Sequence, residues 1–281
     1  MNSNNHGAIK ARRVTLRTLT YVLVIAIVVM VIIPTLFVVF LSFLDTQAIN
    51  NFMANGQFDG VTIENYKNIF STSNIMRWML NSFIVAITQT VLYVFIASFA
   101  AFGFTKLQWK GRNIIFWICM GTMLIPGIIN MVPNYIIIKR LGLYNNLWAM
   151  IIPGLSGVFG VYLMRQFMRN IPRDYIEAAR MDGASYVRIF FTIVLPMCGP
   201  ALASLAIFTF QGAWNDFLWP LIITSSDTQL TLTAGLYNYI QSTTDKALIT
   251  ASSIVSAIPI IIVFIFGQRY FTEGLSGGVK G

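Results

Sequence analysis

The chain has 281 residues, of which 56% are hydrophobic and only 10% charged, with a mean hydropathy of +0.70. Soluble domains carry about 25% charged residues, so this composition excludes a soluble globular protein and predicts segments that contact lipid. The net charge is +9. The basic residues lie between apolar runs and form no dedicated basic face, so we expect no nucleic-acid partner.

The residues that usually carry chemistry are scarce in this chain. Cys119 and Cys198 show no C-x-x-C spacing and offer no disulfide framework, and His6 is the only histidine. The sequence has no G-x-x-x-x-G-K-[S/T] loop for binding nucleotide phosphates. We therefore predict no catalytic residues, no metal site and no cofactor bound by this chain. Any nucleotide chemistry must come from a partner protein.

Six apolar segments are long enough to cross a bilayer, which needs about 20 apolar residues. In chain order they are 19–41, 78–104, 114–138, 145–164, 197–223 and 249–268. The sequence thus predicts an all-α polytopic membrane protein with one transmembrane domain over residues 1–281. Pro126 and Pro133 should kink or break the third segment. Gly154, Gly157 and Gly160 in the fourth segment weaken helix propensity but would let helices approach closely.

The distribution of Lys and Arg predicts the orientation of the chain. With the amino terminus inside, 14 of the 19 basic residues fall on the inner side, which favours both termini in the cytoplasm. Lys139 and Arg140 oppose this bias locally. Tryptophans near predicted outer ends of the spans are expected to anchor in the lipid interface: Trp78, Trp148, Trp214 and Trp219.

Residues 165–196 then lie in the cytoplasm and include a short charged helix. Pro172 suits its first turn, Asp174 and Glu177 favour its positive end, and Gly183 is well placed to end it. About eleven residues are too few to cross a membrane. Ser185 can cap a second helix that leads into Pro196, and we expect a rigid helix continuous with the fifth span. The short helix could rest on lipid headgroups or dock into another protein.

The stretch "EAARMDGASYVRIFFTIVLP" (177–196) contains E-A-A, three residues, G, nine residues and I-x-L-P. It resembles the signature loop of the permease subunits of ABC importers. All of its fixed positions are occupied: Glu177, Ala178, Ala179, Gly183, Ile193, Leu195 and Pro196. The stretches "GAWNDFLWPLI" (212–222) and "YFTEGLSGGVKG" (270–281) resemble the six-helix subunit of the maltose-type carbohydrate permeases.

The resemblance implies a type I ABC importer permease fold in the cell membrane of a prokaryote. It implies a second homologous permease chain, two ATPase subunits that hold ATP and Mg, and an extracytoplasmic solute-binding protein that delivers a carbohydrate. The loop would form a coupling helix lying in a cleft of the ATPase. Together with the faces of the short helix, it nominates these coupling residues: Tyr175, Glu177, Ala178, Ala179, Asp182 and Gly183.

Solute contacts should come from polar residues at membrane depth, where unpartnered polar groups cost several kcal/mol each. The candidates for a substrate pathway are Asn81, Gln89, Asn130, Asn134, Gln211, Asn215 and Asp216. Further candidates are Thr88 and Thr90 in the second span and Ser252, Ser253 and Ser256 in the sixth. Hydrogen bonds between helices are the alternative for all of them. Asp216 could mark the pathway or could face water at the interface.

Two other classes of transporter remain open at this point. A permease for glycerol phosphate or another polyol would look alike. An ion-coupled secondary transporter would need ionisable residues deep in the spans, and Asp216 is the only one inside the six cores. Enzyme activity is not expected of this chain.

Overall fold

A computed structural model describes residues 3–57, 60–71 and 74–277, and side chains within 15–268 of these ranges. Every regular element in these ranges is helical, as predicted. The carboxy-terminal stretch 278–281 and the side chains of 269–277 lie outside this description. The chain divides into two units, one of residues 1–71 and 244–255, the other of 72–243 and 256–281. Each is described by itself, and a single domain stays a prediction.

The first unit contains α1 (Ser3–Leu41), α2 (Thr46–Asn55), α3 (Glu64–Ser71) and the beginning of α15 (Lys246–Gly277). Residues 15–41 of α1 are apolar and long enough to cross a membrane, matching the first predicted span. The following segment carries short capped helices. The Asp45 side chain accepts a hydrogen bond from the Ala48 amide at 2.7 Å, which starts α2.

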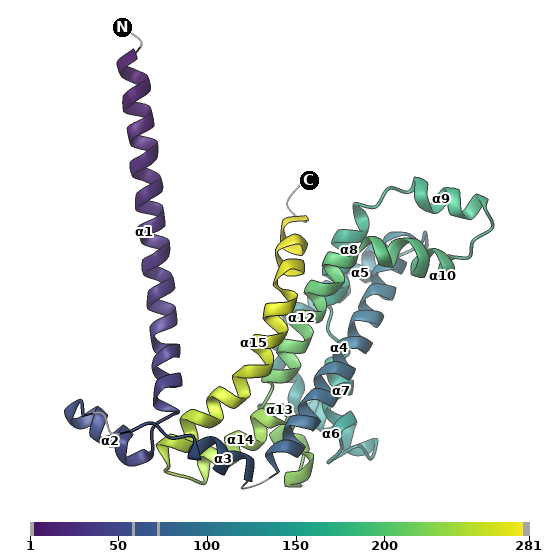
Figure 1. Cartoon of the computed structure of the whole chain (residues 1–281). Helices are drawn as coiled ribbons and strands as arrows, with labels where there is room; N and C mark the ends of the chain where they lie inside the picture. Colours follow the sequence, from purple (N-terminus) through teal and green to yellow (C-terminus); the bar gives the residue numbers. More distant parts are fainter. Residues whose placement is uncertain (1–2, 58–59, 72–73, 278–281) are drawn as a thin grey trace. The chain divides into compact units, whose positions relative to one another are not determined.

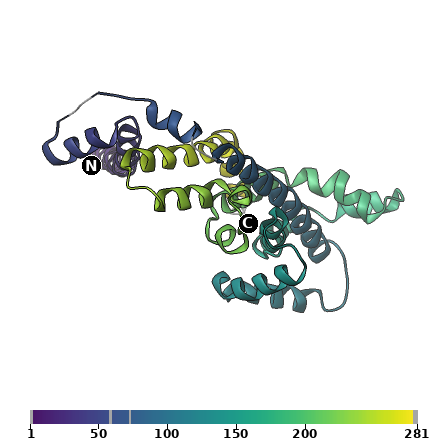
Figure 2. The same ribbon diagram turned by 90° about the horizontal axis from the view of Figure 1, so that it is seen from below.

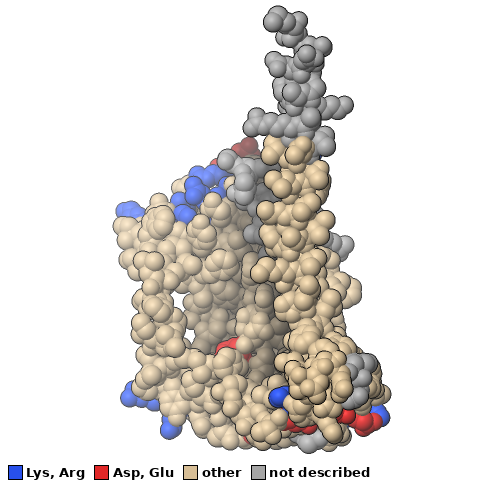
Figure 3. All heavy atoms as spheres, turned by 90° about the vertical axis from the view of Figure 1, so that its left-hand side faces the viewer, with Lys and Arg blue, Asp and Glu red and all other residues tan. Residues whose placement is uncertain are grey.

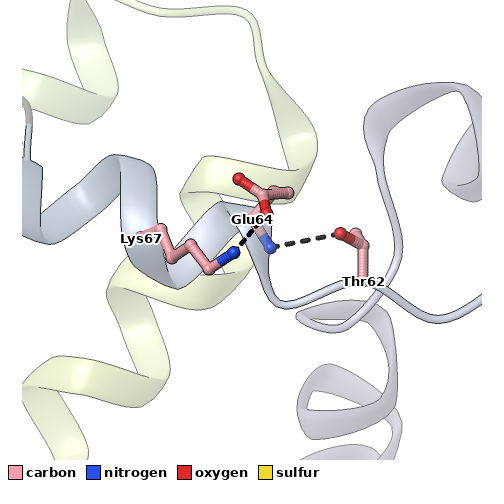
Figure 4. Close-up of polar contacts among 3 residues, drawn as sticks. All are labelled: Thr62, Glu64 and Lys67. Carbon is pink, nitrogen blue, oxygen red and sulfur yellow. Dashed lines mark hydrogen bonds and ion pairs between the residues drawn. The ribbon is translucent and has the colours of Figure 1, made fainter.

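The short helices of this unit are tied to the start of α15. Leu44, Ala48 and Ile49 form a buried cluster with Ala247. Lys246 donates to the Asn50 side chain at 2.7 Å. At the start of α3, Thr62 accepts from the Glu64 amide, and Glu64 pairs with Lys67 (Figure 4).

The second unit is built around α4 (Ile75–Thr105), a continuous helix that matches the second predicted span. It contacts α7 (Leu147–Gly154), α8 (Phe159–Arg169), α12 (Gly199–Asn215) and α14 (Leu232–Gln241). In Figures 1 and 2, α4, α8 and α12 run beside one another. On the left-hand side of Figure 3, Lys and Arg of the second unit lie at its upper and lower ends, and the surface between them is almost uncharged.

Three of the predicted spans are broken helices. The third consists of α5 (Arg112–Gly121), η1 (Thr122–Leu124), η2 (Gly127–Asn130) and α6 (Met131–Arg140), with a bend of 96° at Ile125 and Pro126. The break expected from the prolines is therefore confirmed at Pro126. Pro133 sits in the first turn of α6, where the missing amide costs no helical hydrogen bond.

The fourth predicted span comprises α7 and α8, which meet at 46°. The helix extends beyond the predicted end of this span at residue 164, because α8 continues to Arg169. The fifth comprises α12 and the short α13 (Leu218–Ile223), with residues 216 and 217 between them. The sixth lies within α15, whose residues 246–268 are long and apolar enough to cross a membrane.

Glycines let the fourth span approach α4 closely, as predicted. A Cβ atom added to Gly160 would lie 2.9 Å from the Cβ of Ala97 and 2.8 Å from the Tyr93 hydroxyl. That hydroxyl accepts a hydrogen bond from the Gly160 amide at 2.7 Å. Gly154 likewise lies against the side chain of Gln89. Contact between the helices thus depends on the absence of side chains along α7 and α8.

The prediction that tryptophans anchor in the lipid interface is wrong for three of the four. Trp78, Trp214 and Trp219 are buried, and each indole donates to a backbone carbonyl. The acceptors are Asp227 at 2.7 Å, Ser256 at 3.1 Å and Ala149 at 2.9 Å. A buried indole N–H needs a hydrogen-bond partner, and these backbone carbonyls provide it inside the protein. Trp148 is exposed.

We predict that Gly160→Ala destabilises the second unit by about 1–3 kcal/mol, because its methyl group would overlap Ala97. Thermal unfolding of the solubilised protein measures this effect. Gly103→Ala is the matched control, since Gly103 also lies inside a helix but has open space around its Cβ position. The control should unfold at an equal or higher temperature. Equal melting temperatures of G160A and the wild type would contradict close helix packing at this position.

Candidate functional site

The candidate site is the segment 170–197, which lies at one end of the second unit (Figure 1). It contains α9 (Asp174–Met181), α10 (Tyr186–Ile189), a π-turn at Phe190–Val194 and α11 (Leu195–Met197). α9 has eight residues, fewer than the roughly eleven expected from the sequence. Two acidic residues, Asp174 and Glu177, lie in its first turn, where the helix dipole favours them.

Gly183 ends the α9 turn as predicted. Its φ of +78° lies in the left-handed region, which glycine adopts without strain. The Gly183 amide donates to the Arg180 carbonyl at 3.0 Å, and the Ala184 amide donates to the Ala179 carbonyl at 2.9 Å. This pair of bonds is a Schellman motif. Ser185 then caps α10 by accepting from the Arg188 amide at 3.3 Å, also as predicted.

One side of α9 packs on the protein and the other side is open. Ile176 is buried and Ala179 is half-buried against a cluster that includes Ile189, Phe190 and Val194. Ala179, one of the predicted coupling residues, therefore lies on the packed side of α9. The open face presents Tyr175, Glu177, Ala178, Met181 and Asp182. Met181 is 89% exposed, and the sequence-based set of coupling residues had left it out.

The open face borders a cavity of about 820 Å³ between α9 and residues 106–109. Glu177, Arg180, Met181 and Tyr186 are among its lining residues. Arg180 lies over the Tyr186 ring, with 4.7 Å between the guanidinium carbon and the ring centroid. A carboxylate, two apolar side chains and a stacked cation thus surround a hollow that another protein could fill.

The start of the segment is fixed by Lys106, which follows α4. Its ammonium group donates to the Ile171 carbonyl at 2.6 Å. Burial lowers the pKa of Lys106, and the nearby positive charge of Arg173 lowers this pKa further. The sequence signal for this role was weak, because Lys106 lies 65 positions from its partner.

The expectation of a rigid helix continuous with the fifth span is wrong. Residues 186–197 meet α12 at 82°, with Cys198 at the bend. Pro196, Gly199 and Pro200 surround this bend, and prolines disrupt the continuing helical hydrogen bonds. The two parts are joined by packing instead. Val194, Cys198, Ala201 and Leu205 are buried in the same cluster as Ile176.

The residues predicted for the substrate pathway do not form one group. Asn81 is buried, and its amide donates to the carbonyls of Thr228 at 2.9 Å and Leu230 at 2.8 Å. The Asn81 amide therefore holds the loop before α14 through both of these hydrogen bonds. Gln89 is half-buried against Gly154.

Other members of that set are more open. Asn130 is exposed and Asn134 is half-buried near the break in the third span. Gln211 and Asn215 are both exposed and lie one helical turn apart on α12. Asp216 is half-buried, and its carboxylate accepts from the Trp219 amide at 3.3 Å, which places it at the start of α13. The structure thus brings Gln211 and Asn215 together and gives Asp216 a structural contact.

Comparison with known proteins decides the family. Residues 93–277 match the model of the binding-protein-dependent transport system inner membrane component. The chain belongs to this family of permeases. It is 35% identical over 224 residues to the arabinooligosaccharides transport system permease protein AraQ of Halalkalibacterium halodurans, covering 79% of this chain and 80% of the relative. It is 30% identical over 268 residues to the diacetylchitobiose uptake system permease protein NgcG of Streptomyces coelicolor, covering 92% and 87%.

A solved structure supports the fold of this permease. The chain superposes on a chain of a bacterial ABC transporter involved in the import of the acidic polysaccharide alginate, with a TM-score of 0.80. The likeness covers 92% of this chain and 96% of the other, at 22% identity. The all-α fold with apolar helices is therefore that of a type I ABC importer permease, as the sequence predicted.

We predict that Lys106→Met loosens the start of the α9 segment. The substitution keeps the length of the side chain but removes the donor to the Ile171 carbonyl, at a cost on the order of 1 kcal/mol. Hydrogen exchange should become faster in residues 171–176 and stay unchanged in the middle of α4. Lys110→Met, at an exposed neighbouring position, is the control and should change neither. Unchanged exchange in K106M would show that this hydrogen bond does not hold the segment.

Proposed function

We propose that this permease is the transmembrane subunit of an ATP-driven importer that takes up a sugar or oligosaccharide. The permeases AraQ and NgcG, to which it is similar along most of its length, are named for the transport of arabinooligosaccharides and the uptake of diacetylchitobiose. The family description includes a binding protein, which supports delivery of the solute by an external solute-binding protein. The observation that carries the proposal is the open face of α9 on a helix anchored to the core.

In this proposal, two ATPase subunits with ATP and Mg grip the open face of α9 and pull it as they close. Tyr175, Glu177, Ala178, Met181 and Asp182 are the contacts, and Gly183 sets the turn behind them. Ala179 lies on the packed side and acts by keeping α9 close to the core. Catalysis belongs to the ATPase, and the permease contributes movement.

The movement reaches the spans through side-chain packing. The bend at Cys198 excludes a straight lever, but Ile176, Val194 and Leu205 share one buried cluster with Tyr93 and Ala97 of α4. Displacement of α9 therefore pushes on α4, α8 and α12 together. Rigid-body movement of such packed helices against a second, homologous permease chain would open a central site alternately to the two sides.

The same proposal places the permease in the plasma membrane of a prokaryote with both termini and α9 in the cytoplasm. The carboxy-terminal end of α15 lies at the same end of the second unit as α9 (Figure 1). That arrangement supports the proposal that the carboxy-terminal end of α15 and α9 lie on the same side of the membrane. The excess of Lys and Arg on this side supports the cytoplasm.

For the solute, we propose Gln211 and Asn215 as the leading contacts. Their amides are exposed on one face of α12 and can both donate to and accept from sugar hydroxyls. Asn130 and Asn134 beside the broken third span are second candidates. Asn81 and Asp216 are better explained as structural, because each already hydrogen-bonds to the backbone, and Gln89 because its side chain lies against Gly154.

We predict that Glu177→Lys abolishes carbohydrate uptake while the protein remains in the membrane. Reversing a charge at a docked interface costs on the order of 2–5 kcal/mol, which corresponds to a loss of ATPase binding of about thirty-fold or more. Affinity purification through the permease measures which subunits accompany it. The second permease chain should be retained and serves as the internal control. Normal uptake and normal ATPase recovery at normal abundance would contradict coupling through α9.

We predict different outcomes for two asparagines. Asn215→Ala should raise the half-saturation concentration for uptake by about tenfold, because one to two hydrogen bonds to the solute are lost. Asn81→Ala should lower the melting temperature, because the carbonyls of Thr228 and Leu230 lose their donors. Uptake kinetics and thermal unfolding, both measured on both variants, separate the two roles. An unchanged half-saturation concentration in N215A would remove Asn215 from the pathway.

A further inference from the structure

A second cavity, of about 550 Å³, lies beside the α9 segment and is lined by basic side chains. It is bounded by the end of α4, the start of α5, the end of α8 and the loop up to residue 173. Five cationic side chains line it: Lys106, Arg112, Arg165, Arg169 and Arg173. They come from two stretches of the sequence, 106–112 and 165–173, and the packing of α4, α5 and α8 brings these two stretches together.

Among the residues that line this cavity, no acidic side chain balances these charges. The lining contains no Asp or Glu, and the only ion pair among the described side chains joins Lys67 to Glu64 in the other unit. Arg112 and Arg169 are close enough to Arg165 to repel it, and Arg173 repels Lys106. Gathering like charges costs free energy unless an anion lies among them.

The guanidinium group of Arg165 has a hydrogen-bond donor without a partner in the described part of the chain. Its guanidinium carbon lies over the buried Phe116 ring, 3.8 Å from the ring centroid. Its Nε is buried and has no hydrogen-bond partner in the described part of the chain. A buried donor without a partner is costly. Arg165 also lines the cavity, so an oxygen-rich anion there would accept hydrogen bonds from its guanidinium group.

The start of α5 adds a further attraction for an anion. α5 has ten residues, and its first residues, Arg112 and Asn113, line the cavity. Gly111 precedes them with a φ of +84° and provides no side-chain cap. The positive end of the helix dipole and uncapped amides therefore also face this region.

The surroundings of the cavity indicate where the anion comes from. Trp117, which lines it, is 68% exposed, and Ile114 and Ile118 on the same helix are 68% and 65% exposed. This apolar surface adjoins the cations at the end of the spans, where lipid tails give way to headgroups. Lys106 and Arg173 line the cavity from the loops that follow α4 and α8.

We propose that this cavity binds the phosphate of an anionic phospholipid headgroup, with Arg165 and Arg169 as its principal donors. Basic pockets between spanning helices on the cytoplasmic side are a general form of headgroup site. The acyl chains would lie along Ile114 and Ile118. A bound headgroup would brace α8 and the loop that begins α9, and so the membrane composition would influence the coupling segment.

The test uses the native complex purified in mild detergent, with phosphatidylglycerol or phosphatidylcholine added and retained lipid counted by native mass spectrometry. The wild type should retain phosphatidylglycerol in preference to phosphatidylcholine and should melt at a higher temperature with it. Arg165→Gln combined with Arg169→Gln should weaken retention by about fivefold for each arginine removed. Arg169→Gln alone, at an exposed rim position, covers the case in which the double variant does not fold.

The matched control is Lys139→Gln with Arg140→Gln, an exposed basic pair on α6 at the opposite end of the second unit (Figure 1). It should retain phosphatidylglycerol like the wild type, and equal losses in both pairs would overturn a specific site. Inorganic phosphate that displaces the lipid and stabilises equally well would overturn the lipid as its ligand. Absence of phosphatidylglycerol from the wild-type complex while its ATPase is bound would assign the cavity to an acidic protein segment and overturn the proposal.

Discussion

The structure depends on one constraint, which is that lipid offers no hydrogen bonds to the backbone. Each break in a spanning helix frees carbonyls and amides that the protein must satisfy itself. In the second unit, side chains do this in α7, where Pro153 leaves the Ala149 carbonyl without its helical donor, and in the loop before α14. Trp219 donates to the Ala149 carbonyl, Asn81 donates to two carbonyls before α14, and Ser82 accepts from the Leu232 amide at 2.8 Å.

This constraint changes how polar residues in an apolar chain are interpreted. A buried amide looks like a solute contact when only the sequence is known. Asn81 shows that the same residue can serve the backbone of a distant loop, 147 and 149 positions away. Exposed amides such as those of Gln211 and Asn215 have no such function in the described chain, so they are the stronger candidates for a pathway.

The segment 170–197 has one surface that packs on the core and one that stays open. Ile176 and Ala179 hold α9 on the core, Lys106 fixes its start and the Gly183 turn fixes its end. What remains open is a narrow face with one prominent methionine, Met181, and two carboxylates, Glu177 and Asp182. Because the bend at Cys198 interrupts the helix, force must pass through the buried cluster, whose dense packing transmits displacement.

The sequence by itself determined the helical class, the six apolar segments, the break at Pro126, the Gly183 turn and the Ser185 cap. These features follow from local rules, since hydropathy, proline and glycine act over a few residues. Only the tertiary structure decided the burial of Trp78, Trp214 and Trp219, the inward side of Ala179, the 82° bend before α12 and the gathering of five cations in one cavity. Those features depend on which distant segments meet. No local pattern encodes that, because burial and charge environment are properties of the packed helices together.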